Sequence, residues 1–596
     1  MTAQEKIFEV TSISPGIAIG KTIRIGGSHI IEKVQERFIT ADCVQSELER
    51  FSEVLADTKK SVNELKERLK DKLASSEADI FDSHLMILED MMLINDIENL
   101  IKNDLKCAEF AVFEASERYV KVLEEISDPY LRERAADVRD VRSRVLEHFH
   151  ENEGKSLADN ITGRRIVIAE ELTPSETAHL PSEKVLGFAV SVGSPTSHTA
   201  ILARSMRMPA VVGIPEEVLN LEPNVKIIID GFSGRLIVDP SERTLEAYKL
   251  KAQEVNRFYS GLLEESELLA ETRDGFIVQL GGNIEKLEDV SELKKAGGEA
   301  VGLFRSEISF LSYPAPPSED EQFELYKKLL SDMDGRMVVV RTLDIGGDKL
   351  NDSVFRHQEQ NPFLGLRGIR LCLKAKQDIF RTQLRALLRA SVYGDLKIML
   401  PMLTSVHEVI EVRNLIAELK KELKKEKFPV APKVSLGAMI ETPASALLVD
   451  HIAPLVDFLS IGTNDLVQYT MAIDRSNDLV TYLYQPANPA ILELIGRTVI
   501  AAKENNIWVS VCGQMASDPL YTPLLLGLGV NELSMDPASL SVIRRVIRSL
   551  KMSEAEFLAS EALKCRSSID VRKMSVELLR KTVPEIADII IMPNER

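Results

Sequence analysis

Eight short apolar segments recur through the second half of the chain, and each runs straight into a polar or glycine-rich stretch. Segments with the periodicity of amphipathic helices lie between them, which is the alternation that a β/α barrel requires. The apolar segments begin at Ile277, Ala300, Met337, Leu396, Val434, Asp457, Trp508 and Asn531. This pattern predicts a (β/α)8 barrel over residues 271–596.

The first half of the chain changes its pattern twice. Residues 7–25 alternate apolar and polar positions around a Ser-Pro-Gly turn, which predicts a pair of strands. Helical periodicity with i,i+4 charge pairs follows from Ala41 to His150 and predicts a helical bundle. Strand patterns then return and end near Pro240. Because the opening strands have no other sheet nearby, we expect them to pair with this later block and to leave the bundle as an insertion.

The predicted fold class is therefore an α/β multidomain protein. A small mixed domain is expected over residues 1–30 and 155–240, with an inserted helical domain over residues 35–152. Residues 241–270 favour one continuous helix, which we interpret as a linker between the small domain and the barrel of residues 271–596. Such a connector would permit the small domain to swing.

The composition narrows the class of function. The chain has 596 residues, of which 44% are hydrophobic and 28% are charged, as expected for a globular protein of several domains. A net charge of −19 argues against nucleic-acid binding, which needs clustered Lys and Arg, and suits a basic protein partner. No secretion signal opens the sequence, and no apolar run reaches the roughly eighteen residues of a membrane span. We expect a cytoplasmic protein without membrane insertion.

The cysteines do not have the pattern of a disulfide framework or of a zinc site. They number five, are widely scattered and include no CxxC pair, which makes disulfides or a zinc ribbon a poor interpretation. Cys512 differs from the others because it follows a predicted strand and precedes Gly513. Loops at the carboxyl ends of barrel strands carry reactive groups, so Cys512 is a candidate catalytic residue.

Charged and polar side chains follow several other predicted strands. In a barrel these loops share one face, so residues far apart in sequence would converge there. The candidates are Arg305, Arg341, Glu441, Asn464, Asp465, Arg475 and Cys512. Any single one has a structural interpretation, as a salt-bridge partner or, for Glu441 before Thr-Pro, as a helix cap. Three arginines with two carboxylates at strand ends point instead to an anionic substrate and a cation.

A second chemical signal lies in the small domain. After Pro195 the apolar spacing is helical, with Thr196 or Ser197 suited to cap the start, so His198 would lie in the first turn. Free N–H groups and the helix dipole would stabilise a phosphoryl group on this imidazole by about 1 kcal/mol. A histidine that merely caps or packs remains the alternative.

These residues fall within motifs that resemble the Enzyme I family of the bacterial sugar phosphotransferase system, the phosphoenolpyruvate-protein phosphotransferases. The motifs extend over nearly the whole chain. They are SPGIAIG, PTSHTAILAR, GLFRSE, RTLDIGGDK, NPFLGLRGIR, MIETPAS, SIGTNDLVQYTMAIDR, VCGQMA and LGLGVNELSM. The resemblance implies a swivelling phosphohistidine domain, an inserted helical domain that docks the phosphocarrier protein HPr, and a phosphoenolpyruvate-binding barrel that forms a homodimer.

The resemblance also implies roles for the candidates. His198 would take the phosphoryl group of phosphoenolpyruvate and pass it to a histidine of HPr, and Cys512 would protonate the enolate of pyruvate. The substrate would be bound by Arg305, Arg341, Asn464, Asp465 and Arg475. Glu441 and Asp465 match the family's ligands for Mg²⁺, a hard cation that prefers oxygen donors.

Three positions depart from the family pattern. Pro195 and Gln514 stand where the family usually has a variable or basic residue and a glutamate, and Ser306 replaces a threonine. Two alternatives therefore stay open. The first is a regulatory, nitrogen-type relative, which usually carries a sensory domain ahead of SPGIAIG, where about ten residues stand here. The second is a catalytically impaired interaction protein.

Overall fold

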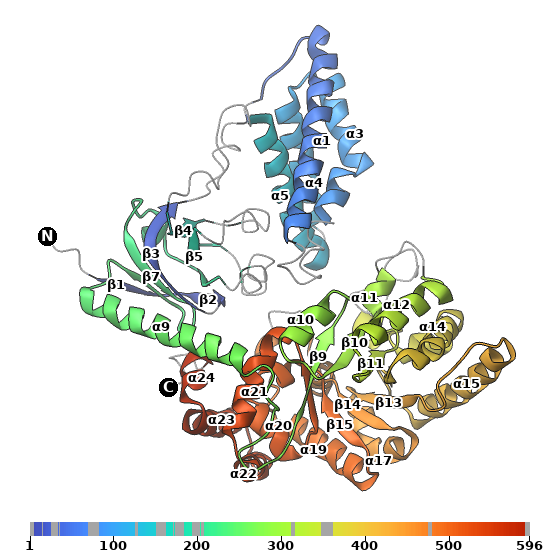
Figure 1. Cartoon of the computed structure of the whole chain (residues 1–596). Helices are drawn as coiled ribbons and strands as arrows, with labels where there is room; N and C mark the ends of the chain where they lie inside the picture. The colour runs from blue at the N-terminus through green and yellow to red at the C-terminus, as the bar shows by residue number, and fades with distance from the viewer. Residues whose placement is uncertain are drawn as a thin grey trace. The chain divides into compact units, whose positions relative to one another are not determined.

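The structure is a computed structural model that forms two compact units, residues 1–257 and residues 258–590. It describes residues 5–14, 16–24, 34, 36–69, 83–125, 129–150, 163–170, 172, 184–192, 203, 208–311, 316–346, 361–474 and 480–590. Each unit is built around a sheet (Figure 1).

The first unit contains one mixed sheet in the order β1-β8-β7-β3-β4-β5-β6-β2. Its strands are β1 (Lys6–Glu9), β2 (Thr11–Ser14), β3 (Ile17–Arg24), β4 (Arg165–Ala169), β5 (Val185–Val190), β6 (Ala210–Val212), β7 (Lys226–Asp230) and β8 (Arg235–Val238). The prediction of two opening strands is wrong: besides the break between β2 and β3 at the Ser-Pro-Gly turn, a break at Val10 separates β1 from β2. The expectation that they pair with the later block is confirmed: β1 pairs with β8, β2 with β6, and β3 with β4 and β7.

The sheet is buried on both faces. In β4, Val167 and Ala169 pack into one apolar cluster and Ile166 and Ile168 into another, as the alternation of side chains along a strand requires. The short helix α8 (Glu216–Leu219) contributes Val218 to the second cluster. The linker helix is observed as α9 (Glu242–Glu264), which ends six residues before the predicted boundary.

Helices lie in the sequence between β3 and β4, as predicted for an insertion. They are α1 (Val44–Leu69), α3 (Met91–Lys102), α4 (Ala108–Glu125) and α5 (Pro129–His150). Asp90 caps α3 by accepting from the N–H groups of Met92 and Leu93, which supplies partners for free donors at the helix start. The apolar stripes of these helices form one core that includes Phe51, Ile101 and Leu146.

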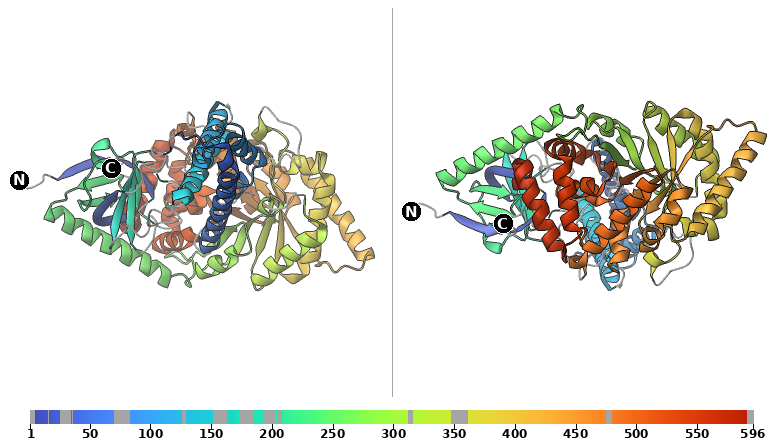
Figure 2. Two further views of the ribbon diagram at one scale, coloured as in Figure 1. Left: turned by 90° about the horizontal axis from the view of Figure 1, so that it is seen from above. Right: turned by 90° about the horizontal axis from the view of Figure 1, so that it is seen from below.

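The second unit is a closed barrel of eight parallel strands, which confirms the predicted fold class. The strands are β9 (Gln279–Ile284), β10 (Ala300–Arg305), β11 (Val338–Arg341), β12 (Leu396–Leu400), β13 (Ser435–Ile440), β14 (Phe458–Ile461), β15 (Trp508–Val511) and β16 (Glu532–Met535). The strand β16 pairs with β9 and closes the barrel. Both views in Figure 2 show helices around these strands.

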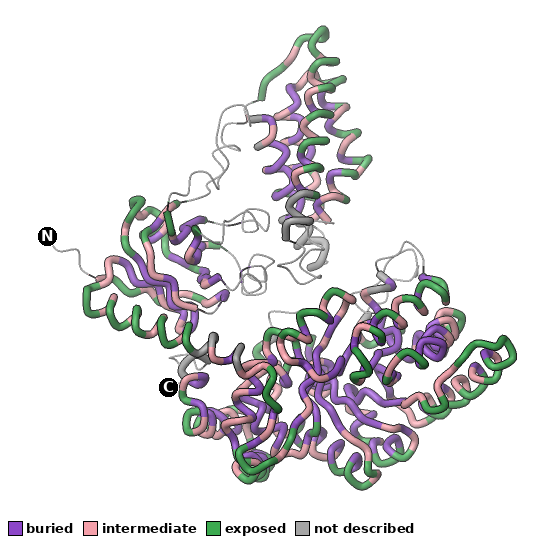
Figure 3. Tube along the Cα trace, in the orientation of Figure 1, coloured by how far each residue is buried: buried purple, intermediate pink, exposed green. Residues whose placement is uncertain are grey.

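The helices of the second unit pack their apolar faces on the strands, and the strands are almost continuously buried (Figure 3). The helices are α10 (Asp289–Lys295), α11 (Ser306–Leu311), α12 (Glu319–Asp332), α13 (Ile369–Lys374), α14 (Gln377–Ala390), α15 (Val406–Lys425), α16 (Pro443–Leu447), α17 (Val449–Ile452), α18 (Thr463–Thr470), α19 (Pro489–Glu504), α20 (Thr522–Leu528), α21 (Leu540–Ser549), α22 (Met552–Ala562), α23 (Ser568–Thr582) and α24 (Pro584–Ile590). Among the described helices, none combines the length and the apolar character that crossing a bilayer needs.

One layer of the barrel interior is apolar and tightly packed. The rings of Phe458 and Trp508 stack with centroids 4.6 Å apart and planes 2° from parallel. Gly437 faces the Phe458 ring so closely that a Cβ there would lie 2.2 Å from a ring carbon. Farther along β14 and β15, and on β16 and β9, the interior carries hydroxyl, thiol, amide and carboxyl groups.

Candidate active site at the carboxyl rim of the barrel

The predicted barrel candidates lie on one rim. Arg305 and Arg341 end β10 and β11, and Glu441 and Cys512 directly follow β13 and β15. Asp465 lies in the first turn of α18, just after β14. Because all eight strands are parallel and the barrel is closed, these carboxyl ends surround a single opening. The sequence-based expectation of convergence is thereby confirmed for the described candidates.

Two predicted site residues cannot be placed. His198 and Arg475 lie outside the described residues, and so does Pro195. Their roles stay predictions.

Arg341 is held in a buried ion-pair cluster. Its guanidinium pairs with Glu307, in the first turn of the short helix α11, and with Asp344 at 3.0 Å. Burial lowers the pKa of Arg341, but the charges of Glu307, Asp344 and Glu441 outweigh it and raise the pKa above the ordinary value. The arginine is therefore permanently charged and fixed in position.

A further guanidinium, Arg367, was not predicted as a site residue. Its Nε and Nη2 donate to Asp344 at 3.0 Å each, and its Nη1 and Nη2 donate to the two oxygens of Asp465 at 3.2 and 2.9 Å. This bidentate pairing on both sides is a strong form of arginine–carboxylate recognition. Arg367 lies in NPFLGLRGIR and Asp344 in RTLDIGGDK, so the motifs contained a signal for both. Their mutual contact depends on the fold.

The loop that follows β11 approaches Arg367 closely. Gly346 has φ of 142°. A Cβ at this position would lie 2.6 Å from the Cβ of Arg367 and 2.6 Å from the carbonyl oxygen of Leu366. A larger residue would displace the arginine, which gives Gly346 a definite steric role. Gly347, which follows it in the sequence, lies outside the described residues.

Glu441 is buried among charges of both signs. Burial raises the pKa of its carboxyl to about 8, and the negative charges of Asp465 and Asp344 add to the effect, while Arg341 and Arg367 oppose it. One oxygen accepts from the backbone N–H of Met402 at 2.6 Å. The alternative role of Glu441 as a helix cap is wrong: Thr442 caps α16, with Pro443 in the first turn.

The rim cluster has the charge and the donors for a divalent cation. Two buried guanidiniums, Arg341 and Arg367, face four buried carboxyl groups, so the cluster carries a net charge of −2 when all are ionised. The four carboxyl groups belong to Glu307, Asp344, Glu441 and Asp465. A hard cation between Glu441 and Asp465 would relieve their repulsion. Within the described residues no set of three His, Cys, Asp or Glu side chains is spaced to hold a metal by itself, so substrate or water oxygens would complete the shell.

Asn464 and Arg305 are positioned by neighbours on the rim. The side-chain oxygen of Asn464 accepts from the backbone N–H of Gln514 at 2.8 Å, which leaves its NH₂ group available to donate to a substrate. Gln514 makes this contact through its backbone, so the contact does not depend on the glutamate that the family usually has. Arg305 pairs with Glu285 at 2.7 Å and keeps a partly exposed side chain.

Ser306 is a sound replacement for the usual threonine. It is fully buried, its hydroxyl donates to the carbonyl oxygen of Arg341 at 2.7 Å, and it accepts from Gln383 at 2.9 Å. These bonds tie the end of β11 to helix α14.

Cys512 is buried, and its thiol is kept protonated. Its side chain is 3% exposed and packs in the interior cluster beside Met439 and Phe458. Burial raises the pKa of the thiol to about 11, and a hydrogen bond from Ser460 only partly opposes this. A thiol in this state is a poor nucleophile and a suitable proton donor.

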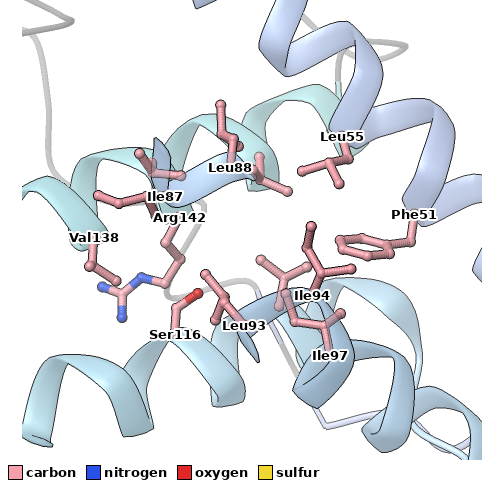
Figure 4. A pocket seen from close by; sticks show the side chains of 13 residues that line it. Phe51, Leu55, Ile87, Leu88, Leu93, Ile94, Ile97, Ser116, Val138 and Arg142 are labelled. Carbon is pink, nitrogen blue, oxygen red and sulfur yellow. The ribbon is translucent and has the colours of Figure 1, made fainter. Parts of the chain in front are cut away.

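The helical insertion contains a small cavity. Its volume is about 20 Å³, and apolar side chains such as Phe51 and Leu55 line one end. Figure 4 shows Arg142 with Ser116 and Val138 at the other end. The Arg142 guanidinium pairs with Glu117 at 2.5 Å. Because the Nη1 of Arg142 is paired with Glu117 and the space is close to that of one water, the cavity is a packing feature of the helices.

Three family models match the chain. They are the N-terminal domain of PEP-utilising enzymes over residues 11–134, their mobile domain over residues 161–234, and their PEP-binding domain over residues 261–552. The phosphoenolpyruvate-protein phosphotransferase of Bacillus subtilis is 43% identical over 94% of this chain and 97% of its own length. That of Listeria monocytogenes is 42% identical over 96% and 99%.

The chain belongs to the phosphoenolpyruvate-protein phosphotransferase family. The resemblance noted in the sequence is thereby confirmed, as is the assignment to the transferases. Among solved structures, the NMR structure of Enzyme I (nEIt) protein is 37% identical, covers 42% of this chain and 99% of its own, and has a TM-score of 0.37.

Proposed function

We propose that this protein transfers the phosphoryl group of phosphoenolpyruvate to its own His198 and then to a histidine of the phosphocarrier HPr, the first general step of sugar uptake. The observation that supports this best is the buried rim cluster of the barrel, where guanidiniums and excess carboxylate lie together. A substrate with one phosphate and one carboxylate needs the guanidiniums, and a divalent cation needs the excess negative charge.

The substrate would be held by its oxygen atoms. Arg305, Arg341 and Arg475 are proposed to pair with the phosphate and carboxylate, and the NH₂ group of Asn464 to donate a further hydrogen bond. Glu441 and Asp465 are proposed to hold Mg²⁺, which would neutralise charge on the transferring phosphoryl group when bound. Since Asp465 is paired with Arg367 here, Arg367 would hold this carboxylate in place for its ligand role.

The transfer step is an in-line displacement. The neutral imidazole of His198 would attack phosphorus, the bond from phosphorus to the enolate oxygen would break, and phosphohistidine and the enolate of pyruvate would form. The thiol of Cys512 would then give its proton to C3 of the enolate, so that pyruvate leaves with a methyl group. A thiol whose pKa is raised to about 11 holds that proton until a strongly basic carbon is formed.

Partners follow from the same proposal. The helical insertion is proposed to dock HPr, and its exposed apolar side chains Met86, Met91 and Met92 are suited to such contact. A homodimer through the barrel and a cytoplasmic location are further expectations of the family assignment.

The test uses the whole protein with labelled phosphoenolpyruvate and Mg²⁺. Intact-mass measurement should detect one added phosphoryl group on the wild type and none on His198→Ala, and the label should be lost in acid. Absence of label on the wild type would refute the proposal. Adding carriers one at a time should show transfer to HPr, and transfer to a nitrogen-type carrier alone would assign the protein to the regulatory branch.

A further inference from the structure

Met402 has an unusual backbone for a buried residue. It stands two residues after β12, and its φ is 56°, in the left-handed region that residues with a Cβ seldom adopt. Among the described residues, eight other than glycine have a positive φ, and Met402 alone of these is buried. Four of the others stand two residues beyond the ends of α12, α15, α18 and α19, where a left-handed residue is a usual helix cap. Met402 does not end a helix, so its conformation needs another explanation.

This backbone directs an N–H group at a carboxyl group of the rim. The N–H of Met402 donates to Oε1 of Glu441 at 2.6 Å. The next residue of the loop is fixed as well, since the carbonyl oxygen of Leu403 accepts from the hydroxyl of Thr442 at 2.6 Å. Two hydrogen bonds between adjacent residues therefore join the loop after β12 to the loop after β13.

A glycine places the second oxygen of Glu441. A Cβ at Gly462 would lie 2.9 Å from Oε2 and 2.9 Å from the Cβ of Glu441, so a residue without a side chain leaves room for the carboxyl group in this orientation. Gly462 directly precedes α18, whose first turn contains Asp465. Oε1 is thus engaged by the loop after β12, and Oε2 lies on the side where α18 begins.

The side chain of Met402 holds the residue in its left-handed conformation. It is 1% exposed. Gly368 approaches it so closely that a Cβ there would lie 2.9 Å from the Cβ of Met402 and 3.1 Å from Oδ1 of Asp344. Gly368 has φ of 57° and ψ of −131°, a combination that favours glycine. A strained residue persists where its surroundings determine its conformation, and such residues gather at functional sites.

We propose that Met402 is a positioning residue for the cation of the rim cluster: its left-handed backbone fixes Oε1 of Glu441 and so presents Oε2 as the ligand atom. The assignment rests on the proposed function, in which Glu441 and Asp465 hold a divalent cation. Hydrogen bonds that orient ligating carboxylates are a general feature of metal sites. A simple turn explains the conformation less well, because glycine would make the same turn without strain. Met402 acts through Glu441 and touches neither the cation nor the substrate.

The test measures cation binding without turnover. Mn²⁺ is the probe, phosphoenolpyruvate is present, and His198→Ala is the parent protein, so that no phosphoryl group is transferred. Electron paramagnetic resonance of free Mn²⁺ gives the dissociation constant. Met402→Val keeps a buried apolar side chain, but its β-branch disfavours a positive φ, so it should weaken Mn²⁺ binding about 10-fold or more. Met402→Gly adopts the conformation without strain and should stay within about twofold of the parent, although it removes the whole side chain.

The glycine beside Glu441 supplies a second variant with a matched control. Gly462→Ala puts a methyl group against Oε2 and should also weaken Mn²⁺ binding about 10-fold. Gly496→Ala, on α19, meets its nearest neighbouring atom at 3.9 Å and should leave the dissociation constant unchanged. Urea unfolding followed by tryptophan fluorescence measures the stability of each variant separately from its Mn²⁺ affinity.

The outcomes separate positioning from packing. A side chain that only packs predicts the opposite order, with Met402→Gly binding Mn²⁺ more weakly than Met402→Val, and that order would overturn the proposal. Parent-like affinity in Met402→Val would overturn it too. If Met402→Val does not fold, Met402→Gly decides, because a loss of affinity there would contradict a role that depends on the backbone alone. Absence of Mn²⁺ binding to the parent protein would instead refute the cation site of the proposed function.

Discussion

Glu532 should make the barrel less stable as the pH rises. Burial raises the pKa of this carboxyl from 4.5 to about 8 in the folded protein, while the unfolded chain keeps the ordinary value. The folded state therefore binds the proton more tightly, so the stabilisation is fully present below about pH 4.5 and is lost as the pH rises through 8. At about 1.4 kcal/mol for each pH unit, ionisation in the folded state costs at most about 5 kcal/mol.

Glu532→Gln tests this calculation because glutamine fills the same space without titrating. Relative to the wild type, the variant should gain about 2–3 kcal/mol of unfolding free energy between pH 6 and pH 8. Urea unfolding followed by tryptophan fluorescence suits the measurement, because Trp508 is the one tryptophan in the sequence and lies in the barrel. The signal thus reports the barrel and not the other unit.

The matched control is Glu556→Gln, an exposed position on α22, whose stability difference from the wild type should not change with pH. Equal pH profiles for the wild type and Glu532→Gln would refute the reasoning, since they would mean that the buried carboxyl does not titrate differently in the folded state.

Three other changes have defined outcomes. Arg367→Met leaves two buried carboxylates without their bidentate partner, so the free energy of barrel unfolding, monitored by tryptophan fluorescence, should fall by about 3–5 kcal/mol. Arg367→Lys should recover only part of this loss. Gly437→Ala forces a methyl group against the Phe458 ring and should cost about 1–3 kcal/mol, with altered tryptophan emission in the native state; an unchanged spectrum and stability would contradict the packing. Because burial raises the pKa of Cys512 to about 11, iodoacetamide at pH 8 should label exposed Cys43 first, and equal labelling by peptide mass spectrometry would exclude a protected thiol.

The barrel could be predicted because its strands are buried on both sides and read as separate apolar runs that each lead into a loop. All eight predicted runs contain an observed strand. The number of opening strands was harder to predict. We expected two strands where three exist, because a single residue, Val10, separates β1 from β2 and the alternation of apolar and polar positions does not reveal so short a break. The pairing of these strands with the later block followed from the need of every strand for a neighbour.

The residues of the candidate site could also be predicted in part from the sequence. Sequence alone identified Arg305, Arg341, Glu441, Asp465 and Cys512, because each follows an apolar run whose end must face the rim. It also carried the family motifs, and with them the predictions for the residues outside the described parts of the chain.

Only the tertiary structure decided how these groups act on one another. Arg367 pairs with Asp344, 23 positions before it, and with Asp465, 98 positions after it, and no local pattern encodes contacts at these separations. The thiol of Cys512 and the acid of Glu532 likewise acquire their proton affinities from burial and from neighbours on other strands. Local periodicity determines where strands and loops occur, whereas the chemistry of the site depends on distances and desolvation that exist only after the barrel has closed.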